Sequence, residues 1–159
     1  MQDIYVVGVG MTPFGKFRDK TIKDMTGEAV TAALSDAGVT ADRIDGAFFS
    51  NAVQGHMEGQ HMIRGEIALR EMGIQGIPVV NVENACASAS TGFKLAVDFL
   101  KAGNGDCCLA VGAEKMYSDD RALMFSAFDS GWDVSNGEEV ARRLADLGAG
   151  VEEPQGSKS

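Results

Sequence analysis

The residue in this sequence that is best suited to covalent chemistry is Cys86, which lies where a buried apolar run meets an amphipathic one. The stretch from 81 to 103 reads NVENACASASTGFKLAVDFLKAG. Small residues on both sides of Cys86 let other atoms approach closely, and the start of a helix favours negative charge. Both conditions suit a thiolate, which is the nucleophilic form of cysteine.

The backbone around Cys86 offers a second contribution to the same chemistry. Amide groups exposed at a helix start can hold an oxyanion, so the Cys86 N–H is a candidate donor to the charge that develops on an attacked carbonyl. The alternative interpretation is a small buried cysteine beside a tight contact between helix and sheet. The residue pattern by itself leaves both interpretations open.

The remaining cysteines and histidines are weaker candidates. Cys107 and Cys108 are adjacent in an apolar run of strand length, and we expect them to be small buried hydrophobic residues. His56 and His61 are the only histidines, and no cysteine lies near them in the sequence. We therefore predict no metal site and interpret both histidines as ordinary loop or helix-end residues.

Gly8 and Gly10 invite comparison with a dinucleotide-binding loop, because they follow an apolar run. The residues after them are Met11, Thr12 and Pro13, where that loop has further glycines at the start of a helix. A nucleotide cofactor is therefore not predicted.

Composition narrows the classes of function. The chain has 159 residues, 45% of them hydrophobic and 23% charged, as in an ordinary globular domain. A net charge of −9 disfavours binding to nucleic acid or to an anionic membrane surface. We find neither a secretion signal nor an apolar segment long enough to span a bilayer, and we expect a cytoplasmic protein.

Strand-like and helix-like segments alternate along the chain. Apolar runs rich in β-branched residues predict strands, and helical periodicity predicts the segments between them. This β-α-β-α-β-α-β order predicts an α/β fold with a mostly parallel sheet. Cys86 then falls at the carboxyl end of a strand, where ligands and chemistry collect in such sheets. The expected strands are 4–10, 45–50, 77–84 and 107–113, and the expected helices are 21–37, 59–73 and 86–102.

Two of these helices carry further signals. Thr21, Asp24 and Gly38 suit the N-cap, the first turn and the C-terminal stop of the helix 21–37. In the helix 86–102, the residues with the spacing of one buried face are Phe93, Ala96, Val97 and Leu100.

The character of the chain changes near residue 114. We assign residues 1–114 to the α/β domain and 115–159 to a partly irregular region with one short helix at 138–148. The segment 85–97 carries a single charge, Lys94, so the helix after Cys86 lacks a charged outer face. A surface of this kind usually marks a contact, and we expect a homo-oligomer.

The run NVENACASAS, the downstream GDCCLAVGAEKM and the opening VVGVGMTPFGKF together resemble the thiolases, in particular the sterol-carrier-protein-2-like branch. The resemblance implies that Cys86 accepts an acyl group from an acyl-CoA or 3-ketoacyl-CoA, as part of lipid metabolism. It also implies a homodimer and coenzyme A as a substrate, with no bound cofactor. Ala89 stands where the family usually has glycine.

The resemblance covers only the N-terminal half of a thiolase and the start of its loop region. The second half brings a Gly-His-Pro histidine and a Cys-x-Gly cysteine, and neither motif occurs here. We therefore expect the C-terminal half to be absent and the chain to be inactive alone. Two alternatives remain, namely a non-catalytic subunit that binds acyl-CoA and a fragment of a ketoacyl-synthase-type condensing enzyme.

Overall fold

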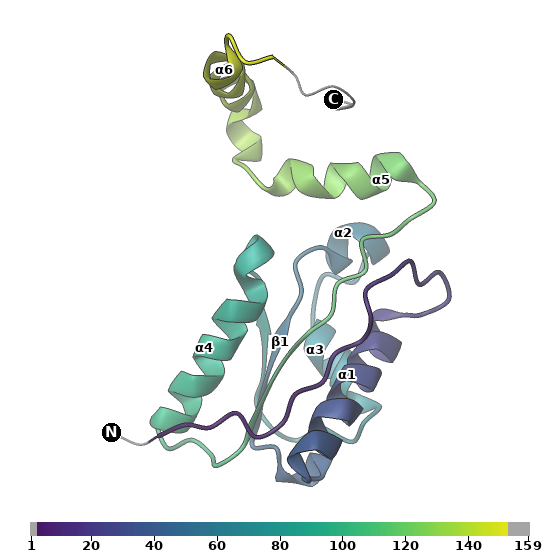
Figure 1. The fold of residues 1–159 in the computed structure, drawn as a ribbon, viewed down its shortest axis with the longest axis vertical. Helices are drawn as coiled ribbons and strands as arrows, with labels where there is room; N and C mark the ends of the chain where they lie inside the picture. Colours follow the sequence, from purple (N-terminus) through teal and green to yellow (C-terminus); the bar gives the residue numbers. More distant parts are fainter. Residues whose placement is uncertain (1–2, 153–159) are drawn as a thin grey trace.

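The computed structural model describes residues 3–152 and consists of a small α/β body with a helical extension above it (Figure 1). The strands are β1 Gly46–Ser50, β2 Val79–Val82 and β3 Cys108–Gly112. The α-helices are α1 Ile22–Ala37, α2 Gln54–Glu58, α3 Arg64–Arg70, α4 Ser88–Lys101, α5 Arg121–Ser126 and α6 Gly137–Gly148. Short 3-10 turns are η1 Ala41–Arg43, η2 Ala85–Ala87, η3 Ala127–Ser130 and η4 Val134–Asn136.

The three strands form one parallel sheet in the order β2-β1-β3. Ser50, the last residue of β1, lies opposite Val82 of β2 on one edge and Gly112 of β3 on the other. The carboxyl ends of all three strands therefore lie side by side. The α/β class and the parallel sheet predicted from the sequence are confirmed.

β1 is the central strand, and all five of its residues are buried. A parallel strand that is covered on both faces has this pattern. Successive side chains point to opposite faces. Accordingly, Phe48 packs with Val82 and Ala96 on one face, whereas Phe49 packs with Ile22 on the other.

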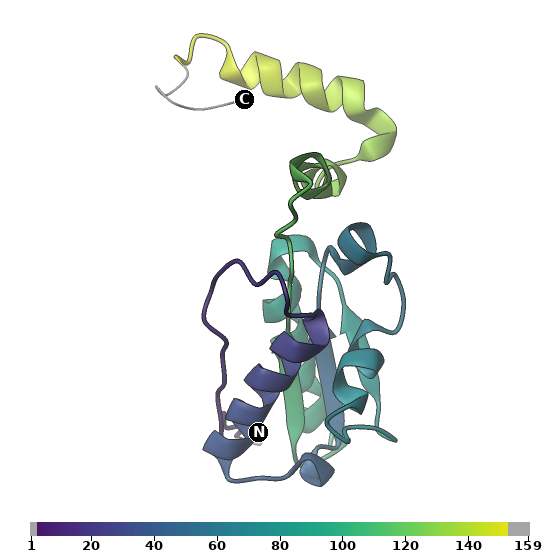
Figure 2. The same cartoon turned by 90° about the vertical axis from the view of Figure 1, so that its right-hand side faces the viewer.

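Helices cover both faces of the sheet (Figure 2). α1 and α3 pack on one face, where Val30 and Leu69 join the larger apolar cluster. α4 alone covers the opposite face and contacts all three strands. The crossover helices thus bury both faces, as parallel strands require.

The ends of α1 follow the sequence prediction. Thr21 is the N-cap, its hydroxyl accepts from the Asp24 amide, and the Asp24 carboxylate accepts from the Thr21 amide in return. Gly38 ends the helix in the left-handed region at φ 66°. Such reciprocal capping satisfies backbone donors that the first turn would leave unpaired.

One predicted helix is shorter in the structure than the sequence indicates. The expected helix 59–73 corresponds to α3 alone, and α2 precedes it as a separate short helix. Ile63, just before α3, has a φ of 48°, which is outside the helical region. The predicted helix is therefore present, but its predicted bounds of 59 and 73 are wrong.

The predicted strand 4–10 is also wrong for this structure, because the segment makes no ladder with the sheet. Its backbone packs against α1 instead. A side-chain Cβ at Gly8 would lie 2.4 Å from the Ala33 carbonyl oxygen, and the Val9 amide donates to Asp36 Oδ2 at 2.9 Å. Apolar β-branched residues favour a strand only where another strand is available to pair.

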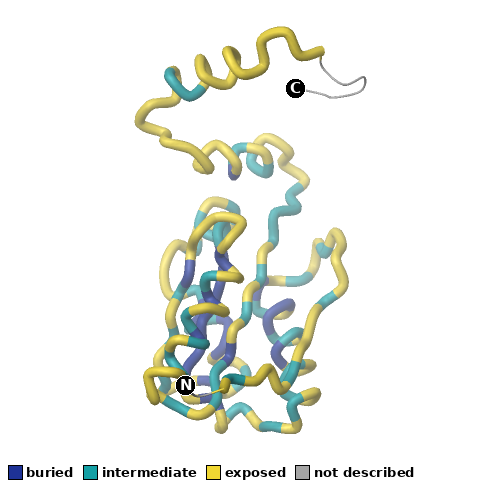
Figure 3. Tube along the Cα trace, turned by 60° about the vertical axis from the view of Figure 1, so that its left-hand side comes forward, coloured by how far each residue is buried: buried dark blue, intermediate teal, exposed yellow. Residues whose placement is uncertain are grey.

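Beyond residue 114 the structure is more helical than the sequence suggests. The predicted helix 138–148 is confirmed as α6, but α5 and two 3-10 turns precede it. Most residues of this extension are exposed (Figure 3). Residues 153–159, part of the predicted irregular region, lie outside the described residues.

The sandwiched position of Phe49 generates a test of the core. Phe49 is 1% exposed, and we expect Phe49→Ala to lower the free energy of unfolding by about 3–5 kcal/mol through lost burial and a residual cavity. Urea unfolding measures this change. Phe14, which is 94% exposed, supplies the control, because Phe14→Ala should change it by no more than about 0.5 kcal/mol. Equal losses in both variants would contradict the described core.

Candidate active site

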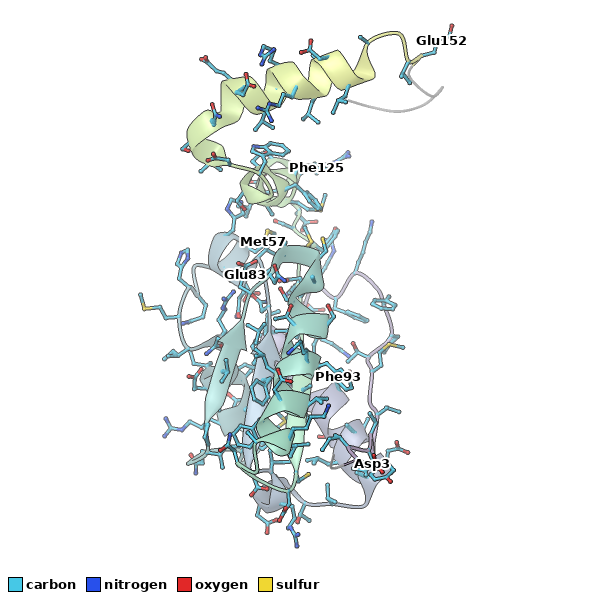
Figure 4. The ribbon with its side chains drawn as sticks, turned by 90° about the vertical axis from the view of Figure 1, so that its left-hand side faces the viewer. Asp3, Met57, Glu83, Phe93, Phe125 and Glu152 are labelled. Atoms are coloured by element: carbon cyan, nitrogen blue, oxygen red, sulfur yellow. The ribbon has the colours of Figure 1, made fainter. Side chains whose placement is uncertain are left out.

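Cys86 lies in the turn η2, between the end of β2 and the start of α4. This position is at the carboxyl end of the sheet, as the sequence predicts. Figure 4 shows the neighbouring Glu83 at the end of the sheet where α4 begins. The Cys86 side chain is exposed, so a substrate can reach the thiol.

A strained backbone holds this turn. Ala85 has a φ of 45°, in the left-handed region that residues with a Cβ rarely adopt. Such a conformation costs about 1–3 kcal/mol and persists where neighbouring contacts determine it. Here the Ala85 amide donates to Glu83 Oε1 at 2.6 Å, and its carbonyl accepts from Ser88 Oγ at 2.7 Å.

The backbone amide of Cys86 is available to a ligand. The amides on either side of it are paired, Ala85 with Glu83 Oε1 and Ala87 with the Asn84 carbonyl at 2.9 Å. Within residues 3–152, no acceptor pairs with the Cys86 amide itself. Within the described residues, the amide and the exposed thiol of Cys86 therefore both lack a hydrogen-bond partner.

The other two cysteines differ from Cys86 in exposure. Both are half-buried at the start of β3. Burial raises the pKa of Cys107, and burial raises the pKa of Cys108 to about 11. Raised pKa values disfavour the thiolate at both positions.

Small residues bring α4 close to the strands beneath it. Ser88, Gly92 and Ala96 form its buried face, so the predicted face is correct only at Ala96. A Cβ on Gly92 would lie 2.6 Å from Ser50 Oγ, and Ser50 Oγ donates to the Ser88 carbonyl at 3.0 Å. This contact fixes the first turn of α4, and with it Cys86, on the end of β1.

A polar network that the sequence analysis missed joins the carboxyl ends of β1 and β3. Asn51 Nδ2 donates to the Ala113 carbonyl at 2.7 Å and to Glu114 Oε1 at 2.8 Å, and Arg64 Nη1 donates to Asn51 Oδ1 at 2.7 Å. Asn51 is 3% exposed, although it carries an amide group. A buried amide needs such partners.

The Glu114 carboxylate also receives a backbone donor, the Ala52 amide, at 2.7 Å. The Glu114 carboxylate thus fixes the loop that follows β1. One signal could have identified the pair: Asn51 and Glu114 each follow a strand predicted to lie in the parallel sheet, and such positions meet at one edge.

The histidines do not pair with the nucleophile. His56 Nε2 lies 2.9 Å from Ser126 Oγ, and both histidines are exposed. Among residues 3–152 no titratable side chain forms a hydrogen bond with the Cys86 thiol, and no group of three metal-binding side chains occurs. The arrangement within the described residues is thus an exposed thiol and a backbone amide of the same residue, with no base hydrogen-bonded to the thiol.

None of the helices within residues 3–152 combines the length and the apolar character that crossing a bilayer requires.

The sequence matches a known protein family. The model of the thiolase N-terminal domain matches residues 4–146, which is nearly the whole chain. The chain belongs to the thiolase family. The match includes β1, β2, β3 and the Cys86 turn.

Curated relatives agree with membership of the thiolase family. The chain is 36% identical over 157 residues to the non-specific lipid-transfer protein-like 2 of Caenorhabditis elegans. This alignment covers 91% of the chain and 37% of the relative. It is 33% identical over 139 residues to the acetyl-CoA acetyltransferase of Methanothermobacter thermautotrophicus. That alignment covers 86% of this chain and 36% of the acetyltransferase. Human sterol carrier protein 2 is 33% identical over an alignment that covers 79% of this chain and 23% of the human protein. The chain therefore spans at most about a third of these relatives.

Two solved structures share the fold with this chain. The priming β-ketosynthase of the R1128 polyketide pathway matches with a TM-score of 0.56 at 26% identity, covering 69% of this chain and 33% of that one. The 3-oxoacyl-[acyl-carrier-protein] synthase III of Aquifex aeolicus matches with a TM-score of 0.55 at 17% identity. The match covers 67% of this chain and 35% of the synthase chain. The second likeness shows the fold alone.

The exposures of the cysteines generate a test of the assigned nucleophile. Iodoacetamide should alkylate Cys86 at least roughly tenfold faster than Cys107 or Cys108 in the folded chain, because burial shields the last two and disfavours their thiolates. Peptide mapping over a time course measures the three rates. In urea the rates should converge, and equal rates in the folded chain would remove the assignment.

The contact between α4 and β1 generates a second test. Gly92→Ala should lower the free energy of unfolding by about 1–3 kcal/mol, because its Cβ collides with Ser50 Oγ. Gly27 in α1 is the matched control. A Cβ there meets only Met72 Sδ at 3.9 Å, and Gly27→Ala should stabilise the fold by about 0.4–1 kcal/mol. Urea unfolding of both variants checks the opposite signs, and a stabilising Gly92→Ala would rule out the close approach.

Proposed function

We propose that this chain supplies the nucleophile of a thiolase-type acyl transfer, in which Cys86 carries the acyl group between coenzyme A thioesters. The observation that carries the proposal is the exposed Cys86 thiol beside an unpaired amide at the carboxyl end of the sheet. Membership of the thiolase family and the relatives named acetyl-CoA acetyltransferase support the same class of reaction.

The proposed step is covalent catalysis at sulfur. The Cys86 thiolate attacks the carbonyl carbon of an acyl-CoA, and the Cys86 amide donates to the oxygen that becomes negative. The carbon–sulfur bond to coenzyme A then breaks, coenzyme A leaves as its thiolate, and the acyl group remains on Cys86. For a 3-ketoacyl-CoA the attack is at the 3-keto carbon, and the carbon–carbon bond breaks to release acetyl-CoA after protonation.

Proton transfer in this reaction needs a further group. The attacking thiol must lose a proton and the departing carbanion must gain one, and no base is paired with Cys86 in the part of the chain that the structure describes. General acid–base groups contribute about 10²–10⁴-fold to such reactions. We therefore propose that acylation by this chain alone is slow and that steady turnover requires groups from the remainder of a thiolase.

A ketosynthase-type condensation is the second candidate. The likeness to the priming β-ketosynthase favours it as far as the fold is concerned. Both candidates use an acyl-cysteine at the same point of the sheet and differ in the acceptor. Transfer of the acyl group from Cys86 to free coenzyme A would favour the thiolase type.

Acylation of a single residue tests the proposal. After incubation with acetoacetyl-CoA and acid quenching, mass spectrometry should find one acetyl group on the peptide that contains Cys86, together with a stoichiometric release of acetyl-CoA. Cys86→Ser should remove the modification, whereas Cys107→Ser and Cys108→Ser should retain it. Equal acetylation of Cys86→Ser, or fast steady turnover by the unaided chain, would overturn the proposed role or the proposed need for further groups, respectively.

A further inference from the structure

Five consecutive backbone amides, from residue 84 to residue 88, run through the turn that carries Cys86. Four of them donate hydrogen bonds within the turn, namely those of Asn84, Ala85, Ala87 and Ser88. Within residues 3–152 no acceptor pairs with the fifth, which is the Cys86 amide. The turn therefore satisfies its own donors and leaves open the donor that belongs to the nucleophile.

Ser88 holds the peptide group that contains the Cys86 amide. Its Oγ donates to the Ala85 carbonyl at 2.7 Å and accepts from the Asn84 amide at 2.8 Å. The Ser88 amide donates to the same Ala85 carbonyl. A serine hydroxyl has a single proton to donate, so the bond to Ala85 uses the whole donor capacity of this side chain.

The direction of the Ala85 carbonyl determines the direction of the Cys86 amide. Both groups belong to one peptide unit, which is planar, and the described residues contain no cis peptide bond. In a planar trans peptide the C=O and N–H bonds point in opposite directions. Because the carbonyl is held toward Ser88, which is 6% exposed, the Cys86 N–H points away from the packed interior.

Ser88 is itself fixed to the central strand. Ser50, the last residue of β1, is 5% exposed, and its Oγ donates to the Ser88 carbonyl at 3.0 Å. A continuous series of hydrogen bonds thus runs from the end of β1 through Ser88 to the peptide unit of Ala85 and Cys86.

Glu83 holds the other side of Ala85. Its Oε1 accepts from the Ala85 amide at 2.6 Å, while Ser88 holds the Ala85 carbonyl. Ala85 is therefore gripped at both of its backbone polar groups, and its φ of 45° is one that residues with a Cβ rarely adopt. Unlike Ser88, Glu83 is exposed.

We propose that Ser88 is a positioning residue for acylation, whose hydroxyl directs the Cys86 amide at the oxygen of the carbonyl that the thiol attacks. Glu83 supports the same orientation through the Ala85 amide. This inference rests on the proposed function, because it takes the Cys86 amide to be the oxyanion donor. Loss of one oxyanion donor slows acyl transfer about 10²–10³-fold, and a misdirected donor loses part of the same benefit.

Two reactions of the same thiol separate positioning of the amide from reactivity of the sulfur. With p-nitrophenyl acetate, the Cys86 sulfur bonds to the acetyl carbon, the carbonyl oxygen becomes negative, and p-nitrophenolate then leaves. With iodoacetamide, the sulfur displaces iodide at a methylene carbon and no oxyanion forms. The rate of acetylation divided by the rate of alkylation, both measured at Cys86 by peptide mapping, therefore reports on the oxyanion donor. We call this quotient the acetylation ratio.

Removal of the Ser88 hydroxyl is the direct test. Ser88→Ala should lower the acetylation ratio roughly tenfold or more, because the Cys86 amide is no longer directed at the oxyanion. Ser90→Ala is the matched control in the same helix. Ser90 Oγ donates to the Ala87 carbonyl at 2.9 Å, and the peptide unit of that carbonyl carries the Ser88 amide, so the ratio should stay unchanged. Circular dichroism establishes that both variants are folded.

Glu83 supplies a second pair of variants at an exposed position, where folding is not at risk. Glu83→Ala removes the acceptor of the Ala85 amide and should lower the acetylation ratio. Glu83→Gln keeps a side-chain oxygen at this point and should restore most of it. Both variants remove the carboxylate charge, so a purely electrostatic effect on the thiol would be the same in the two.

The inference is overturned by an unchanged acetylation ratio in folded Ser88→Ala, or in Glu83→Ala where Ser88→Ala does not fold. An equal fall in Ser88→Ala and Ser90→Ala would overturn it as well. Acetylation by p-nitrophenyl acetate needs no coenzyme A. If acetoacetyl-CoA leaves wild-type Cys86 unmodified while the ratio still depends on Ser88, the proposed function fails and the positioning role of Ser88 stands.

Discussion

The site depends on one constraint, which is that β1 is paired in parallel on both of its edges. This pairing places the ends of β1, β2 and β3 beside one another, 30 or more residues apart in sequence but at one rim of the sheet. The network of Asn51 and Glu114 then joins two of these ends through side chains. α4 can approach the same rim because Gly92 leaves room for Ser50. These contacts determine the position of Cys86, because its own side chain takes part in none of them.

The same arrangement determines which chemical groups are available at the rim of the sheet. The rim presents the Cys86 thiol and the Cys86 amide, both of which come from one turn. Two carboxylates at the rim are already engaged, Glu114 with the Asn51 side chain and the Ala52 amide, and Glu83 with the Ala85 amide. Under the proposed function, the α/β body therefore provides the groups for the acylation step only.

Local signals in the sequence were sufficient for some elements and not for others. The capping box at Thr21 and the glycine at 38 are short-range features, and α1 begins and ends where they predict. The position of Cys86 followed from the order of strands and helices. The network of Asn51 and Glu114 joins residues 63 apart, so no local pattern reveals it. The run 4–9 has a strand composition, yet pairing depends on a neighbour that periodicity cannot supply. The break before α3 rests on the backbone of Ile63, whose residue type usually avoids that conformation.

The alanine before the nucleophile has a consequence for how precisely the thiol is positioned. A glycine at residue 85 would adopt the observed φ of 45° freely, together with many other conformations. Alanine has few neighbouring conformations to visit once the bonds to Glu83 and Ser88 hold it there. The turn therefore loses little entropy when a substrate arrives, because its disorder has already been removed during folding. At this position, a residue that destabilises the fold restricts the conformations of the turn that carries Cys86.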